Sequence, residues 1–170
     1  MRIDMVMRKL AFIAFIFLAA TSFAQWAKAP LRIPSQRDPN LYRADVDAQQ
    51  EIAQTISEAD KENKRILLVF GAAWCGDCYA LDYGFHQPRV EPLLSANFKV
   101  VHVNVGRFDK NLDLVKKYHV DLEKGIPSLA VLTPKGGVLY STAEFERARV
   151  MTEEDLITFL NAWKPPAQQK

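Results

Sequence analysis

The chain has 170 residues, of which 49% are hydrophobic and 25% are charged, and its formal net charge is +2. This composition is typical of a soluble globular protein, and the length allows one domain with an ordinary core. The small net charge gives no electrostatic reason to expect nucleic acid or an anionic membrane surface as a partner.

The first 24 residues have the pattern of a secretory signal peptide. Arg2, Arg8 and Lys9 precede an apolar run over residues 10–20, and the small-residue site Ser22-Phe23-Ala24 follows it. We therefore expect cleavage after Ala24 and export to the periplasm. The apolar run is shorter than the ~18–20 residues that span a bilayer, so a retained membrane anchor is the weaker alternative.

Loss of this leader would leave a mature chain of neutral formal charge. It would remove three basic residues and one acidic residue from totals of 22 and 20, which leaves 19 of each sign. Residues 25–40 contain Pro30, Pro34 and Pro39 among polar residues, which predicts an extended segment outside the core. The folded domain is expected over residues 41–164, followed by a polar tail over residues 165–170.

Helical and strand patterns alternate within this domain. Apolar residues recur at helical spacing over residues 47–63, and the continuous apolar run within residues 65–71 predicts a buried central strand. The elements expected next, in chain order, are a helix over 78–94 with a break near Gly84 and a second start around Pro88, a strand over 98–105, a short helix over 110–118, strands over 128–132 and 137–140, and a final helix.

The C-terminal elements have clear boundary signals. Thr133-Pro134-Lys135-Gly136 favours a tight turn, so the strands on either side of it should form an antiparallel hairpin. Thr152 and Asp155 have the spacing of a helix N-terminal cap, and Pro165 ends the helix. Alternating strands and helices with a terminal hairpin predict an α/β fold, in which a mixed central β-sheet has helices on both faces.

The chain contains two cysteines, Cys75 and Cys78, separated by Gly76 and Asp77. A Cys-x-x-Cys ring closes almost no loop, so its value is chemical, and a small stapled turn is the weaker alternative. The pair is expected where a buried strand ends and a helix begins. Unpaired N–H groups and the helix dipole stabilise a thiolate there, which makes Cys75 the candidate nucleophile and Cys78 the candidate resolving thiol.

Metal binding is the competing interpretation of the cysteine pair. A structural zinc site needs a second Cys or His pair at ligand spacing, and the three histidines are scattered singly, so we expect no metal site. Delivery of a soft metal such as copper through two thiolates, or partner binding without redox turnover, remains an alternative. No Met-rich or nearby His ligand set strengthens it.

Three motifs make the sequence resemble the thioredoxin family over roughly residues 41–163. They are the apolar strand 66–70, Trp74-Cys75-Gly76-Asp77-Cys78, and Gly125-Ile126-Pro127-Ser128. The resemblance implies the thioredoxin fold, with Pro127 cis and facing the cysteines and with the backbone beside it, at Ile126, pairing with substrate. It also implies that Trp74 contributes to the rim of the substrate surface. An ordinary trans turn at Pro127 and simple packing of Trp74 are the alternatives.

Residues 78–94 are most similar to periplasmic thioredoxin-like domains such as the C-terminal domain of the disulfide reductase DsbD. That similarity implies a reductive thiol–disulfide oxidoreductase whose redox-active disulfide is its sole reactive group, with no further cofactor. Its expected partners are protein thiols or disulfides and an upstream redox protein. We expect a monomer that binds no nucleic acid and contacts a membrane only through an uncleaved leader.

Three positions depart from the usual family pattern. Asp77 replaces a common Pro, and an acid there would oppose a nearby thiolate and favour a reducing pair, unless it is exposed and without influence. Val69 replaces a buried Asp that assists the resolving cysteine, and His102 replaces the Lys beside it. We hypothesise that His102 supplies some of the missing proton transfer, with a packed strand histidine as the alternative.

Overall fold

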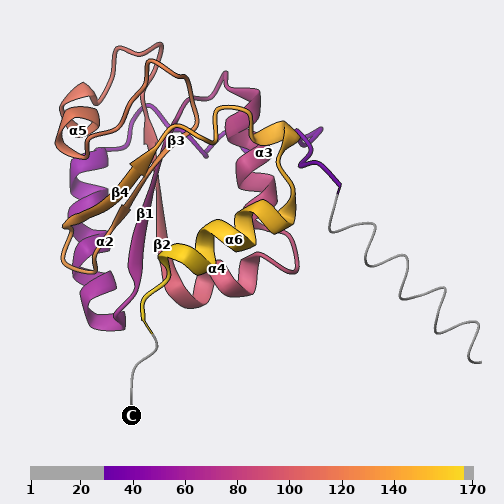
Figure 1. Cartoon of the computed structure of the whole chain (residues 1–170). Helices are drawn as coiled ribbons and strands as arrows, with labels where there is room; N and C mark the ends of the chain where they lie inside the picture. Colours follow the sequence, from indigo (N-terminus) through magenta and orange to yellow (C-terminus); the bar gives the residue numbers. More distant parts are fainter. Residues whose placement is uncertain (1–28, 167–170) are drawn as a thin grey trace, which may run out of the picture.

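The computed structural model describes residues 29–166 (Figure 1). The predicted signal peptide and the end of the predicted tail lie outside these residues. Within the described part of the chain, no helix is long and apolar enough to cross a membrane.

A four-stranded mixed sheet in the order β2-β1-β3-β4 forms the centre of the domain. The strands are β1 (Arg65–Gly71), β2 (Phe98–Asn104), β3 (Ser128–Leu132) and β4 (Val138–Thr142). β1 pairs in parallel with β2 and antiparallel with β3, and β3 and β4 form an antiparallel hairpin. These pairings confirm the mixed sheet and the hairpin.

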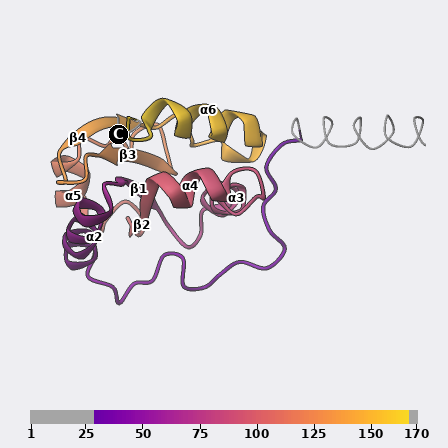
Figure 2. The ribbon, with the colours of Figure 1, turned by 90° about the horizontal axis from the view of Figure 1, so that it is seen from below.

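Helices cover both faces of this sheet (Figures 1 and 2). α2 (Ala48–Glu62) and α5 (Leu112–Lys117) contribute to one core cluster, whereas α3 (Gly76–Phe85), α4 (Glu91–Asn97) and α6 (Glu153–Trp163) contribute to the other. A short 3₁₀ turn, η1 (Ala148–Val150), precedes α6. Most boundaries lie within two residues of the predicted ones.

The helix expected over residues 78–94 differs more from its prediction. It begins earlier, at Gly76, and its break falls at residues 86–90 rather than at Gly84. Gly84 lies inside α3, where Leu156 and Leu31 pack so closely that there is no room for a side chain. An added Cβ would lie 2.6 Å from Leu156 Cδ1 and 2.8 Å from Leu31 Cδ1. The glycine therefore permits close packing and does not end the helix.

The central position of β1 in the sheet explains why its sequence is a continuous apolar run. Residues 66–70 are at most 1% exposed. Ile66, Leu68 and Phe70 belong to the core cluster beneath α2, and Leu67 and Val69 belong to the cluster beneath α3 and α6. A strand with helices on both faces buries both sets of alternating side chains.

The N-terminal segment over residues 25–40 is predicted to lie outside the core, and Leu31 contradicts that prediction. Residues 31–40 contain no helix or strand, as predicted for an extended segment. Leu31, however, is 5% exposed and packs in the cluster that includes α3 and α6. Its N–H donates to the Met151 carbonyl at 2.7 Å, which fixes the segment against the turn before α6.

We predict that Gly84→Ala destabilises the protein although alanine has the higher helix propensity. The new methyl group would overpack Leu31 and Leu156, at a cost of about 1–3 kcal/mol in the free energy of unfolding. Urea denaturation measures the change. Thr158→Ala, at an exposed position of α6, is the control and should stay within about 0.5 kcal/mol of wild type. A Gly84→Ala variant as stable as wild type would contradict this packing argument.

Candidate functional site

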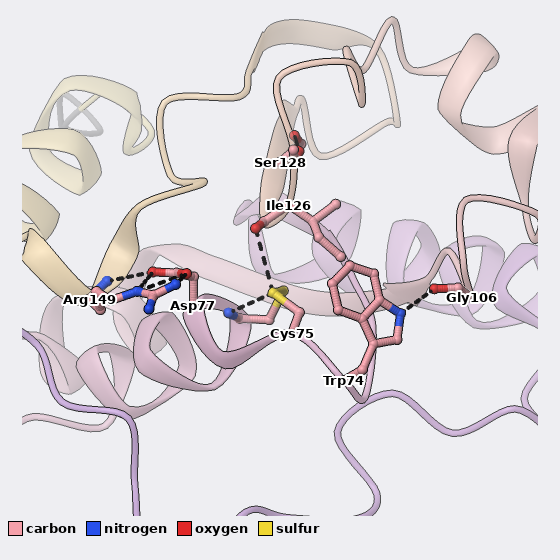
Figure 3. The surroundings of a disulfide bond; sticks show 9 residues. Trp74, Cys75, Asp77, Gly106, Ile126, Ser128 and Arg149 are labelled. Carbon is pink, nitrogen blue, oxygen red and sulfur yellow. Dashed lines mark hydrogen bonds and ion pairs between the residues drawn. A yellow bond between two sulfur atoms is a disulfide. The ribbon is translucent and has the colours of Figure 1, made fainter.

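Cys75 and Cys78 form a disulfide at the N-terminus of α3 (Figure 3). Cys75 is the N-cap residue of the helix, and the backbone N–H of Cys78 donates to its Sγ at 3.0 Å. The two residues are 4% and 1% exposed. Cys75 Sγ thus lies where helix N–H groups stabilise a thiolate, as a nucleophile requires, whereas Cys78 lies behind it.

The loop before β3 brings a backbone carbonyl to the disulfide. The Ile126–Pro127 peptide bond is cis, and the Ile126 carbonyl oxygen lies 3.5 Å from Cys75 Sγ. A disulfide sulfur has no hydrogen to donate, so this is a contact in the oxidised form that the thiol form can convert to a weak hydrogen bond. Ser128 Oγ donates to the Gly125 carbonyl at 2.8 Å and so holds the loop in place.

Trp74 lies beside Cys75 at the surface. The residue is 50% exposed, and its Nε1 donates to the Gly106 carbonyl at 2.8 Å. The exposed ring of Phe108 packs edge-on against it, with 5.8 Å between ring centroids. The loop over residues 106–111 therefore contributes an aromatic contact to the rim.

Asp77 is buried and paired, so it is not the exposed acid that the sequence left open. It is 6% exposed, and Arg149 Nε donates to its two carboxylate oxygens at 3.0 and 3.1 Å. Arg149 Nη2 and the Arg149 backbone N–H also contact the carboxylate. Burial alone would raise the pKa of Asp77, but the hydrogen bonds and charge of Arg149 outweigh burial and hold that pKa below its usual value.

His102 contacts a carboxyl group that sequence reasoning missed. It lies opposite Val69 in the β1–β2 register, and its Nε2 is 3.7 Å from Asp82 Oδ1. Burial lowers the pKa of His102 to about 4, and burial raises the pKa of Asp82. His102 is therefore neutral near neutral pH, so the contact is not an ion pair there, and at 3.7 Å it is too long for a hydrogen bond.

The contact between His102 and Asp82 lies close to the resolving cysteine along α3. Asp82 follows Cys78 by four residues in α3, so both side chains lie on one face of the helix, a turn apart. That spacing was a signal available in the sequence. Arg149 had no such signal, because it is 72 residues from Asp77.

Within residues 29–166, no group of three or more His, Cys, Asp and Glu side chains is arranged to hold a metal ion. The site that the structure assembles consists of the disulfide, the Ile126 carbonyl, the Trp74 rim, the buried carboxyl group of Asp77 and the partly buried one of Asp82.

The lowered pKa of His102 predicts an acid-sensitive stability. The unfolded chain binds a proton at His102 near pH 6.5 and the folded chain only near pH 4. Lowering the pH through this window therefore lowers the free energy of unfolding, by up to about 1.4 kcal/mol per pH unit. Urea unfolding between pH 7 and pH 4.5 should show a smaller loss for His102→Gln than for wild type. His119→Asn, at an exposed histidine, is the control. Equal losses in wild type and His102→Gln would contradict the burial of His102.

Comparisons with known proteins agree with this geometry. The sequence pattern described as thioredoxin-like matches residues 47–134. A crystal structure of a disulphide isomerase from Xylella fastidiosa Temecula1 is 34% identical and covers 75% of this chain and 98% of its own, with a TM-score of 0.69. No curated protein matches the sequence.

A second structural neighbour is the oxidised C-terminal domain of DsbD from Neisseria meningitidis. It is 18% identical and covers 70% of this chain and 97% of its own, with a TM-score of 0.53. At this identity the match supports a shared fold. The family pattern spans half of the chain, the first neighbour aligns over nearly its entire length, and the cysteine pair is at disulfide distance. The chain therefore belongs to the thioredoxin-like family and has the fold and the Cys-x-x-Cys disulfide of its thiol–disulfide oxidoreductases.

Proposed function

We propose that the protein reduces protein disulfides outside the cytoplasm through Cys75 and Cys78. The observation that carries the redox assignment is the environment of Cys75 Sγ, which accepts the Cys78 N–H at the start of α3 and faces the Ile126 carbonyl. Helix N–H groups stabilise the thiolate, and the free peptide edge beside the sulfur suits an extended client chain.

The exchange proceeds in two steps. In the reduced protein, the Cys75 thiolate attacks one sulfur of a client disulfide, forms a mixed disulfide and releases the first client thiolate, which takes up a proton. Cys78 then loses its proton, and its thiolate attacks Cys75 Sγ. This step forms the Cys75–Cys78 disulfide and releases the second client thiol. Two electrons and two protons pass to the client, and an upstream dithiol protein returns them.

The direction and the compartment are supported by different features. Export is supported by the leader pattern of residues 1–24. The reductive direction is supported by the similarity of residues 78–94 to the DsbD domain. Asp77 no longer supports it, because Arg149 compensates the charge of that carboxylate. The neighbour described as a disulphide isomerase is compatible with the same first step, attack of a thiolate on a client disulfide.

We also propose that Asp82 exchanges the proton of Cys78 during resolution and that His102 acts on Asp82. The carboxyl lies one turn beyond Cys78, and burial raises its pKa above the usual value of an Asp, which favours proton exchange. His102 lies against that carboxyl rather than against a sulfur atom. In this proposal His102 acts on the resolving cysteine indirectly, through Asp82.

Reduction of insulin disulfides tests the redox assignment. Cys75→Ser should lower the rate at least about 10³-fold because it removes the nucleophile. Cys78→Ala should accumulate a mixed disulfide at Cys75, visible as an added client mass that dithiothreitol removes. Metal analysis of the purified wild type runs alongside. An inactive wild-type protein with one copper ion per chain would overturn the proposal in favour of metal delivery.

The pH profile of mixed-disulfide resolution tests the proton route. Asp82→Asn removes the exchangeable proton and should slow resolution about 10-fold or more near neutral pH, within the usual range for lost acid–base assistance. His102→Gln should move the pH midpoint of the profile while leaving the maximum rate within about threefold. Asp113→Asn, an exposed acid on α5, is the control. Profiles of Asp82→Asn and wild type that superimpose would exclude Asp82.

A further inference from the structure

Arg149 reaches the active-site helix from a distant part of the chain. It lies in η1, the turn between β4 and α6. Its hydrogen bonds to Asp77 join two residues that are 72 positions apart in the sequence. Figure 3 shows Arg149 beyond Asp77, on the side of Cys75 opposite Trp74. Its side chain is 59% exposed, whereas that of Asp77 is 8% exposed. The guanidinium therefore closes the solvent side of a buried carboxylate.

The position of Asp77 makes this contact relevant to the cysteines. Asp77 is the second residue of α3 and stands directly between Gly76 and Cys78, in the first turn that Cys75 caps. A negative charge there opposes ionisation of Cys75, whereas the helix N–H groups favour it. An unpaired carboxylate with this burial would be costly as well as repulsive. The planar guanidinium satisfies both oxygens and carries the opposite charge.

We infer that Arg149 is a positioning residue for disulfide exchange: it holds Asp77 against η1 and cancels the charge of that carboxylate beside Cys75, so that the Cys75 thiolate forms readily. This inference rests on the proposed function only in that the exchange uses the Cys75 thiolate. It assigns a redox role to a residue of the turn before α6, outside the Trp74–Cys78 and Gly125–Ser128 motifs.

Other charged groups also face the start of α3. Arg147 acts on Asp77 through its charge. An Arg37 amino nitrogen lies 3.9 Å from the place that a Cβ of Gly76 would occupy. Asp82 lies a turn beyond Cys78 and is the other carboxyl on this helix. These groups remain unchanged in the Asp77–Arg149 charge cycle described below, so their contributions cancel when its variants are compared, and Arg147 is replaced only in a separate control.

The test is a charge cycle on the pair, read from the pH dependence of Cys75 alkylation by iodoacetamide. A Cys78→Ala background leaves Cys75 as the only thiol in the protein. Arg149→Gln should raise the measured thiol pKa by about half a pH unit to one pH unit, because Asp77 loses its compensating charge. Asp77→Asn should lower the thiol pKa by a similar amount, because Arg149 is then unpaired. The double variant should return close to the starting value.

Two controls separate charge compensation from a purely structural role. Arg149→Lys keeps the charge and should keep the thiol pKa within about 0.3 pH units of the starting protein, even where it lowers stability through the lost fork geometry. Arg147→Gln, at an exposed neighbour without a hydrogen bond to Asp77, should shift the thiol pKa less than Arg149→Gln does. Urea denaturation of each variant confirms that it is folded.

The sign pattern decides the inference. Single variants that shift the thiol pKa in the same direction, or an Arg149→Gln variant that leaves it unchanged, would overturn the role of Arg149. Alkylation needs no client protein, so this result is independent of insulin reduction. Failure of the charge cycle with normal insulin reduction would reject Arg149 alone, and loss of insulin reduction with an intact cycle would reject the proposed function alone.

Discussion

Burial of β1 on both faces fixes the position of the reactive sulfur atoms. A strand whose alternate side chains enter two different cores cannot slide without exposing one of the two sets, so the point at which β1 ends is also fixed. Cys75 follows that end by four residues, and its N–H donates to the Ala72 carbonyl at 3.0 Å. Because this connection is short, α3 must begin beside the end of the sheet.

The site then forms because three other segments reach the same end of the sheet. The loop before β3 supplies the Ile126 carbonyl, the loop after β2 accepts the Trp74 indole N–H, and η1 supplies Arg149. None of these segments is adjacent to the cysteines in sequence. Each is held by a backbone or side-chain hydrogen bond rather than by packing alone, which suits a surface that must remain open to a client.

Two aspartates on α3 show how neighbours decide the behaviour of a buried carboxyl. Both are withdrawn from solvent, which by itself raises the pKa of each. Arg149 donates to Asp77 and reverses that effect, so Asp77 stays ionised. Asp82 has no arginine partner of this kind: burial and the charge of Asp38 raise its pKa and outweigh the opposing effect of His86, so that pKa stays raised. One carboxyl is suited to constant charge and the other to proton exchange.

The sequence by itself determined the elements whose signals are local. The apolar run of β1, the turn at residues 133–136, the Thr152–Asp155 cap and the Cys-x-x-Cys spacing each depend on a few neighbouring residues, and the structure contains all of them. Tertiary structure alone decided which side chains meet. Leu31 entered the core, Gly84 continued a helix, Arg149 neutralised Asp77 and His102 met Asp82, because each outcome depends on atoms brought together by folding from distant positions. Contacts of that kind leave no periodicity or spacing in a single sequence, and here they set the charge around the disulfide.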